Sequence, residues 1–234
     1  MTLATLRKEL RHQASAERAA GSQRFFKTGP GEYGEGDQFL GLSVPQTRAL
    51  VPQTDALSED DVLTLLHSEW HEERLIALFI LIRRFGKARK SDAAQKHLID
   101  LYLANTRWIN NWDLVDTSAP HLLGAWLLKR DRSVLDRLAA STSLWEQRIS
   151  VLTTQAFIRA GDFTDTLRLC QRFLTHKHDL MHKACGWMLR EIGNRNEHVL
   201  RTFLDQHTTT MPRTMLRYAI EKLPEKDRKS FLAQ

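Results

Sequence analysis

A short segment, residues 108–116, contains the residue types needed to stabilise a cation. Trp108, Trp112 and Asp116 follow one another at steps of four residues, so a helix through the whole segment would place them on one face. Indole faces carry negative quadrupoles, and a carboxylate supplies a full negative charge. These side chains therefore suit a reaction whose transition state is a cation.

The same segment has other interpretations. Asn111 is a possible N-cap, which would start the helix at Trp112 and put Asp113 in a first turn where the helix dipole favours an acid. Only Trp112 and Asp116 would then share a face. In either case Pro120 bends or restarts the helix one turn beyond Asp116. The alternative without chemistry is that the tryptophans are core residues and the acid is solvated or capping.

The composition indicates an ordinary globular chain. Of its 234 residues 42% are apolar, and the longest apolar run, residues 75–82, is too short to cross a bilayer. The first residues are charged and helical rather than a signal peptide. Two cysteines make no disulfide framework, and no Cys/His cluster has zinc spacing. We expect a soluble cytoplasmic protein with no membrane association, no cofactor and no metal.

The elements that must position these residues are helices. Strand signals are few, and amphipathic helical periodicity covers nearly the whole chain. The predicted helices are 2–14, 16–26, 45–51, 59–66, 72–85, 93–103, 112–129, 133–140, 144–160, 163–173, 180–193, 197–206 and 213–223. Ser58 with Asp61 predicts a capping box at one start. Gly86, Gly161 and Gly193 mark expected ends.

The helices recur in pairs, each an apolar helix with basic residues preceded by a more polar one. The apolar helices begin near residues 72, 115, 146, 182 and 213. Irregular pairs of this length are typical of a HEAT-like α-solenoid, in which each unit buries its apolar face against its neighbours. The predicted fold class is therefore all-α, a HEAT-like helical-repeat solenoid. We expect a single curved domain over residues 1–234.

The charges also follow the repeats. The net charge is +6 and the pI is about 9.5, a modest excess that favours an acidic partner. The second helices hold Arg83, Arg84, Lys129, Arg148, Lys183, Arg190, Arg213 and Arg217. Cations repeated along the concave surface of a solenoid would form a track for phosphates, and the alternative is a solvated face without a partner.

Other candidate sites are weaker. The glycine-rich insert at residues 27–37 lacks the terminal Gly-Lys-Ser/Thr of a P-loop and carries three acids, so a mobile surface connection is expected. Only His178 and His182, among several nearby histidines, have helical spacing, and no carboxylate completes a metal site. Cys185 fits a small packing residue better than a nucleophile.

Three motifs carry a resemblance to a known family. They are RFFKTGPGEYGEGDQFLGLSVPQTR at residues 24–48, NWDLVDTSAP at 111–120 and KACGWMLREIG at 183–193, and WEQR at 145–148 matches as well. In this order they span essentially the whole chain. The sequence resembles the AlkD-like family of DNA alkylation repair glycosylases, which are built from HEAT-like repeats.

The resemblance implies base excision repair. Such an enzyme hydrolyses the N-glycosidic bond of cationic N3- and N7-alkylpurines, such as 3-methyladenine and 7-methylguanine, in duplex DNA. The matching catalytic residues are Asp116, Trp112 and Trp187, and Arg148 would hold a phosphate. Lys183 and Arg190 join it as DNA-binding residues of the basic second helices, and metal ligands are absent. No lysine is placed as a Schiff-base nucleophile, so we expect a monofunctional hydrolase that acts as a monomer.

Two other functions use the same residues differently. A non-catalytic DNA-binding repeat protein would need the cations but not Asp116, whose charge would weaken binding to DNA. A protein–protein scaffold would need neither. Release of N7-methylguanine from duplex DNA distinguishes the enzyme from both of these alternatives. We expect the protein to be cytoplasmic and to associate with the nucleoid when it is bound to DNA.

Overall fold

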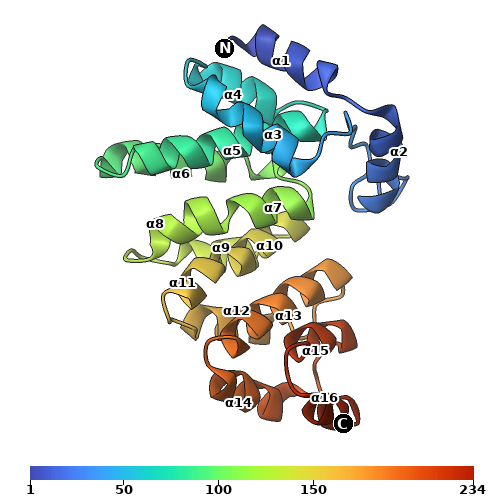
Figure 1. Ribbon diagram of the computed structural model, residues 1–234. Helices are drawn as coiled ribbons and strands as arrows, with labels where there is room; N and C mark the ends of the chain where they lie inside the picture. The colour runs from blue at the N-terminus through green and yellow to red at the C-terminus, as the bar shows by residue number, and fades with distance from the viewer. The chain divides into compact units, whose positions relative to one another are not determined.

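The computed structural model describes residues 1–234 and consists of helices and turns, with no β-strand (Figure 1). Extended backbone pairs only in one isolated parallel bridge between Gln38 and Trp70. The predicted all-α helical-repeat class is therefore confirmed. No helix combines the length and the apolar character needed to span a lipid bilayer.

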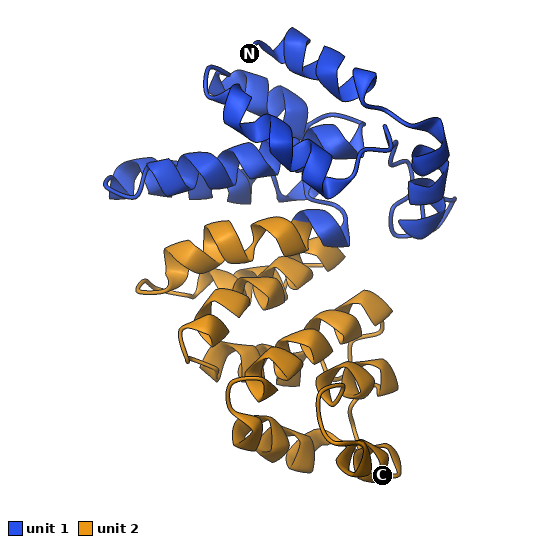
Figure 2. Ribbon diagram, viewed as in Figure 1, with its two compact units in different colours: residues 1–114 blue, residues 115–234 orange.

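The chain packs as two compact units, residues 1–114 and residues 115–234 (Figure 2). Unit 1 contains α1 (Leu3–His12), α2 (Ala16–Phe25), α3 (Val44–Leu50), α4 (Glu59–Leu66), α5 (His71–Lys87) and α6 (Asp92–Ala104), with 3-10 turns at Val51–Thr54 and Thr106–Trp108. The boundary falls within α7 (Trp112–Ser118). That the two units form one continuous domain stays a prediction.

Unit 2 contains the remaining helices. They are α8 (Ala125–Leu127), α9 (Val134–Ala139), α10 (Leu144–Thr153), α11 (Gln155–Arg159), α12 (Thr164–Arg172), α13 (Asp179–Gly193), α14 (Glu197–His207), α15 (Arg213–Ala219) and α16 (Glu225–Leu232). The apolar helices pack in succession, α10 against α13 and α13 against α15. This succession is the packing expected of stacked repeats.

Helix α5 is the core element of unit 1. It packs against α3, α4 and α6, and its residues from His71 to Leu81 are buried without interruption. A helix that is buried all round has no polar face, which explains the apolar run seen in the sequence.

The first turn of α5 buries four consecutive polar residues, and each one holds another segment. The Glu72 carboxylate accepts backbone N–H bonds from Leu40, Gly41 and Leu42 at 2.8–3.2 Å. The Glu73 carboxylate accepts from Arg7 and Arg11 of α1. His71 and Arg74 bind the glycine-rich insert. Buried polar groups need such partners, so this turn orders the N-terminal third of the chain around α5.

Close approach of helices in unit 2 depends on glycine. A Cβ at Gly186 of α13 would lie 2.5 Å from the Met215 carbonyl oxygen and 2.5 Å from the Tyr218 Cβ. No real Cβ is found at such distances, so α13 and α15 reach this separation only with glycine between them. The motif residue before Trp187 therefore has a packing role.

The predicted helix boundaries are mostly within two residues of those observed, and the capping box at Ser58 and Asp61 is present. The predicted helix 112–129 is interrupted by a π-helical turn at Pro120–Gly124, in which the Gly124 N–H donates to the Ala119 carbonyl. The bend expected at Pro120 is thus confirmed, because proline lacks the N–H that an α-helix needs. Helix α16 was not predicted, since its sequence contains a single buried apolar residue, Phe231.

Candidate functional site

The start of α7 decides between the two helical interpretations of residues 108–116. The Asn111 side-chain oxygen accepts the backbone N–H of Trp112 at 2.8 Å, and α7 begins at Trp112. Trp108 belongs to a separate 3-10 turn and stacks on His67, with ring centroids 5.0 Å apart. The Asn111 alternative is therefore correct, and Trp108 is not on the helix.

Trp112 lies in an aromatic cluster of unit 1. Its indole stacks on Phe26 at a centroid distance of 5.2 Å and meets Phe25 edge-on at 5.8 Å. Phe25 is 65% exposed, which is unusual for so large an apolar side chain. Sequence reasoning did not single out these phenylalanines, although the pair stands within the motif at residues 24–48.

Asp116 is held by Arg148 in unit 2. The guanidinium of Arg148 donates to both carboxylate oxygens, at 2.8 and 2.7 Å, and a third bond reaches the Leu180 carbonyl at 2.5 Å. The Arg148 side chain is 5% exposed and that of Asp116 is 13% exposed. A fork-to-fork pair of this kind fixes the orientation of the carboxylate. Arg148 is thus a buried partner of Asp116 in this structure rather than an open cation.

Helix α13 carries the other predicted site residues. Lys183, Trp187 and Arg190 follow at steps of four and three, so they share one helix face. The Trp187 indole is partly exposed, and its N–H donates to the Glu191 carboxylate at 3.3 Å. The structure therefore presents an indole beside two cations on this helix.

The predicted phosphate-binding cations all have acidic neighbours. Lys183 pairs with Asp179 at 2.8 Å, and Arg190 pairs with Glu221. A phosphate would have to compete with these carboxylates, and the Lys183 pair, with side chains 39% and 53% exposed, is more accessible for such an exchange than Arg190, which is 19% exposed. DNA binding by Arg148, Lys183 and Arg190 stays a prediction.

A buried ionic network joins the insert to α5 and α7. The His71 imidazole lies between two carboxylates, 3.1 Å from Asp37 and 2.8 Å from Asp113. Arg74 donates to Asp37 at 2.5 Å, and the Asn111 amide donates to the same carboxylate at 3.1 Å. The sequence placed Asp37 in a mobile surface connection. That expectation is wrong for this end of the insert, because Asp37 is 6% exposed and bound on three sides.

The network shifts the pKa values of two of its members, His71 and Asp37. Burial alone would lower the pKa of His71, but the charge and hydrogen bond of Asp113, with the bond to Asp37, raise it to about 9 from the usual 6.5. Burial would raise the pKa of Asp37, and the His71 hydrogen bond and the Arg74 charge bring it below its usual value of 3.8. His71 is therefore an imidazolium at neutral pH.

We expect the free energy of unfolding to fall as the pH rises through about 9. The folded state raises the pKa of His71 from 6.5 to about 9, so protonation of His71 contributes about 3 kcal/mol to the free energy of unfolding. This contribution is complete below pH 6.5, the pKa in the unfolded chain, and is lost above about pH 9, the pKa in the folded protein. Urea unfolding from pH 6 to 10 should show this slope in the wild type and not in His71→Gln. His97→Gln, at an exposed pair with Glu59, is the control and should keep the slope. Parallel curves for wild type and His71→Gln would contradict the assignment.

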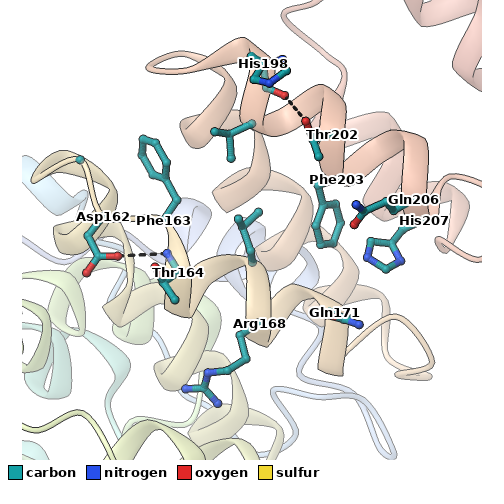
Figure 3. Close-up of a pocket in the computed structure, with 13 residues that line it drawn as sticks. Asp162, Phe163, Thr164, Arg168, Gln171, His198, Thr202, Phe203, Gln206 and His207 are labelled. Carbon is teal, nitrogen blue, oxygen red and sulfur yellow. Dashed lines mark hydrogen bonds between the residues drawn. The ribbon is translucent and has the colours of Figure 1, made fainter.

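A cavity of about 670 Å³ lies elsewhere, between α12 and α14 (Figure 3). Its wall combines apolar side chains such as Phe163 and Phe203 with Arg168, Gln171 and His207. None of the predicted site residues lines it. The cavity and the predicted site residues therefore lie on different parts of the chain.

The histidines and cysteines have structural partners. His178 caps α13 by accepting the Leu180 N–H at 3.1 Å, and the His182 ring donates to the His176 carbonyl at 2.5 Å. No group of three His, Cys, Asp or Glu side chains is arranged to hold a metal ion. Cys170 and Cys185 are buried, and burial raises the pKa of the Cys170 thiol well above its usual value. Such thiols pack rather than react.

Comparison with known proteins agrees with the fold and the motifs. Residues 6–223 match the family described as DNA alkylation repair enzyme. Among solved structures, a predicted DNA alkylation repair enzyme from Enterococcus faecalis superposes with a TM-score of 0.68 over 91% of this chain and 98% of that chain, at 14% sequence identity, which shows a shared fold. No curated protein sequence matches significantly. Because the family match extends over nearly the whole chain, the protein belongs to the DNA alkylation repair enzyme family and has a role in the repair of alkylation damage.

Proposed function

We propose that this protein is a monofunctional DNA glycosylase that hydrolyses the N-glycosidic bond of cationic N3- and N7-alkylpurines in duplex DNA. The family membership supports repair of alkylated DNA, and one observation supports the reaction: the bidentate hold of Arg148 on Asp116. It holds the carboxylate in one orientation, beside a positive charge, before substrate arrives. Preorganised charge of this kind is among the larger contributions to catalysis.

The proposed chemistry needs only one carboxylate. An alkylated purine already carries positive charge, so the electron pair of the breaking bond leaves with the base, and the base departs neutral. The deoxyribose becomes an oxocarbenium ion, which Asp116 stabilises electrostatically. Asp116 then orients a water for attack at C1′, and the proton released goes to the carboxylate or to solvent. No nucleophilic amine takes part, so the DNA strand stays intact.

The indoles of Trp112 and Trp187 would stabilise the same sugar cation as Asp116. Trp112 and Trp187 contact the deoxyribose and contribute cation–π attraction of about 0.5–2 kcal/mol each as charge develops. They also exclude bulk water, which strengthens the effect of Asp116. The exposed Phe25 beside Trp112 extends the aromatic surface.

Duplex DNA is the proposed partner, bound by a monomeric protein in the cytoplasm. Lys183 and Arg190 contact phosphates beside the lesion, and Arg148 contributes positive charge behind Asp116. Binding through phosphates is independent of sequence and weakens as salt rises.

Lys183→Ala is expected to weaken duplex binding for all sequences and to reduce the slope of log affinity against log salt by about one. The matched control is Lys96→Ala, which removes another lysine that pairs with a carboxylate four residues away on its own helix, Asp100. Fluorescence anisotropy at several salt concentrations measures both slopes. A slope unchanged by Lys183→Ala would show that this lysine does not contact a phosphate.

The proposed reaction is tested directly by base release. The protein is incubated with a duplex containing N7-methylguanine, and the free base is separated and quantified. We expect stoichiometric release in a single turnover and no strand break until alkali is added. Retained DNA binding without release would favour the non-catalytic binder instead.

A further inference from the structure

The glycine-rich insert reaches the candidate site through one buried cation. His71 of α5 bonds Asp37, at the end of the insert, and Asp113, in the first turn of α7, through its two ring nitrogens. Asp37, Asp113, His71 and Arg74 are all buried, and their formal charges balance. An imidazolium is the side chain that donates at both ends of such a bridge.

A second connection runs through Asn111. Its amide group donates to Asp37 at 3.1 Å, and its oxygen accepts the Trp112 N–H at 2.8 Å. The position of Asp37 is therefore transmitted to the backbone at which α7 begins. Gly34 allows this contact, because a Cβ there would lie 2.5 Å from the Phe26 carbonyl oxygen and 3.3 Å from the Asn111 amide nitrogen.

An aromatic stack makes the third connection. Phe39 stacks on the His71 ring at 4.6 Å, Phe26 stacks on Phe39 at 5.1 Å, and Trp112 stacks on Phe26 at 5.2 Å. The indole of Trp112 thus rests on the ring of Phe26, and the rings of Phe26 and Phe39 both contact the His71 ring. A change at His71 should therefore affect Trp112 in two ways: through the hydrogen bonds that link Asp37 to Asn111 and Asn111 to the Trp112 backbone, and through the stacked rings of Phe39 and Phe26.

We propose that His71 is a positioning residue for Trp112 and that the insert, through Asp37, is part of the scaffold of the site. This inference rests on the proposed glycosylase function. A buried ion network is often no better for stability than well-packed apolar residues, and in some proteins it instead defines a geometry. Here the network would define the position of the Trp112 indole, which we propose contacts the deoxyribose as positive charge develops on it.

The test compares His71→Gln with Glu73→Gln. Both variants neutralise a fully buried ionic residue in the first turn of α5, but Glu73 binds Arg7 and Arg11 of α1 and has no contact with Trp112. Single-turnover base release, duplex affinity and the ¹⁹F resonance of 5-fluorotryptophan at position 112 are measured at a temperature where each variant is folded. Trp112→Phe assigns the resonance.

His71→Gln should slow base release about 10- to 100-fold, the effect of a small misplacement at a reacting centre, and change duplex affinity less than about 3-fold. The Trp112 resonance should shift or broaden. Glu73→Gln should leave all three unchanged. Should His71→Gln fail to fold, Asp113→Asn, which keeps the side-chain shape, should give the same three results.

Two outcomes would overturn the inference. One is a Trp112 resonance unaltered by either network variant. The other is an equal loss of base release in Glu73→Gln, which would make the network a source of stability only. If the wild type released no base, the proposed function would fail, whereas the resonance would still decide whether His71 positions Trp112.

Discussion

Asp116→Asn is expected to lower single-turnover release of N7-methylguanine by about 100- to 1000-fold. The amide keeps the shape of the carboxylate but not its charge, so it neither stabilises the oxocarbenium ion nor orients the attacking water. Duplex binding should persist and become slightly tighter, because a negative charge near the phosphates is removed. Quantifying free base at saturating protein separates the chemical step from binding.

A matched variant controls for the loss of a partly buried ion pair. Asp165 in unit 2 is 14% exposed and pairs with Arg132 and Arg168, much as Asp116 is 13% exposed and pairs with Arg148. Asp165→Asn should therefore have a similar cost in stability and leave base release intact. Near wild-type release by Asp116→Asn would show that this carboxylate is not catalytic.

Neutral lesions should resist the enzyme while cationic ones are released. Hypoxanthine and uracil leave readily only when protonated, and none of Asp116, Trp112 and Trp187 is suited to donate that proton. We expect release of N7-methylguanine to exceed release of hypoxanthine by about 100- to 10,000-fold, the usual contribution of a general acid. Matched duplexes that differ only in the lesion make the comparison under single-turnover conditions.

A third duplex with a bulkier N7 adduct tests how the base is recognised. Because Trp112 and Trp187 are expected to contact the sugar and not the base, the bulky cation should remain a substrate. Efficient release of hypoxanthine would reveal a general acid, and rejection of the bulky adduct would reveal a pocket that encloses the base.

Much of the fold follows from local sequence. The apolar period of the helices, the Ser58 cap and the break at Pro120 are decided by residues within a few positions of one another, and these predictions are confirmed. The family was also accessible, because its motifs are contiguous. Both alternatives in the sequence put Trp112 and Asp116 on one helix face, and the start of α7 after Asn111 decided that Trp108 is not on that helix.

The partners of the site residues depend on tertiary structure. Packing of unit 2 brings Arg148, which the sequence assigned to a phosphate, against a carboxylate 32 residues earlier, a partner that the sequence did not indicate. The role of His71 could not be predicted from the sequence, because a single histidine before an apolar run has no local signature. Its bonds to Asp37 and Asp113 span 34 and 42 residues and exist only once α5 is buried.

The sequence by itself determined where helices form and which residue types could stabilise a cation, because both depend on short-range periodicity and side-chain chemistry. Only the tertiary structure decided that Asp116 pairs with Arg148, and that Trp108 stacks on His67. It also decided that the insert ends at Asp37 in a buried ionic network. Ion pairs between distant segments are set by how helices pack, and desolvation then fixes which charges must meet.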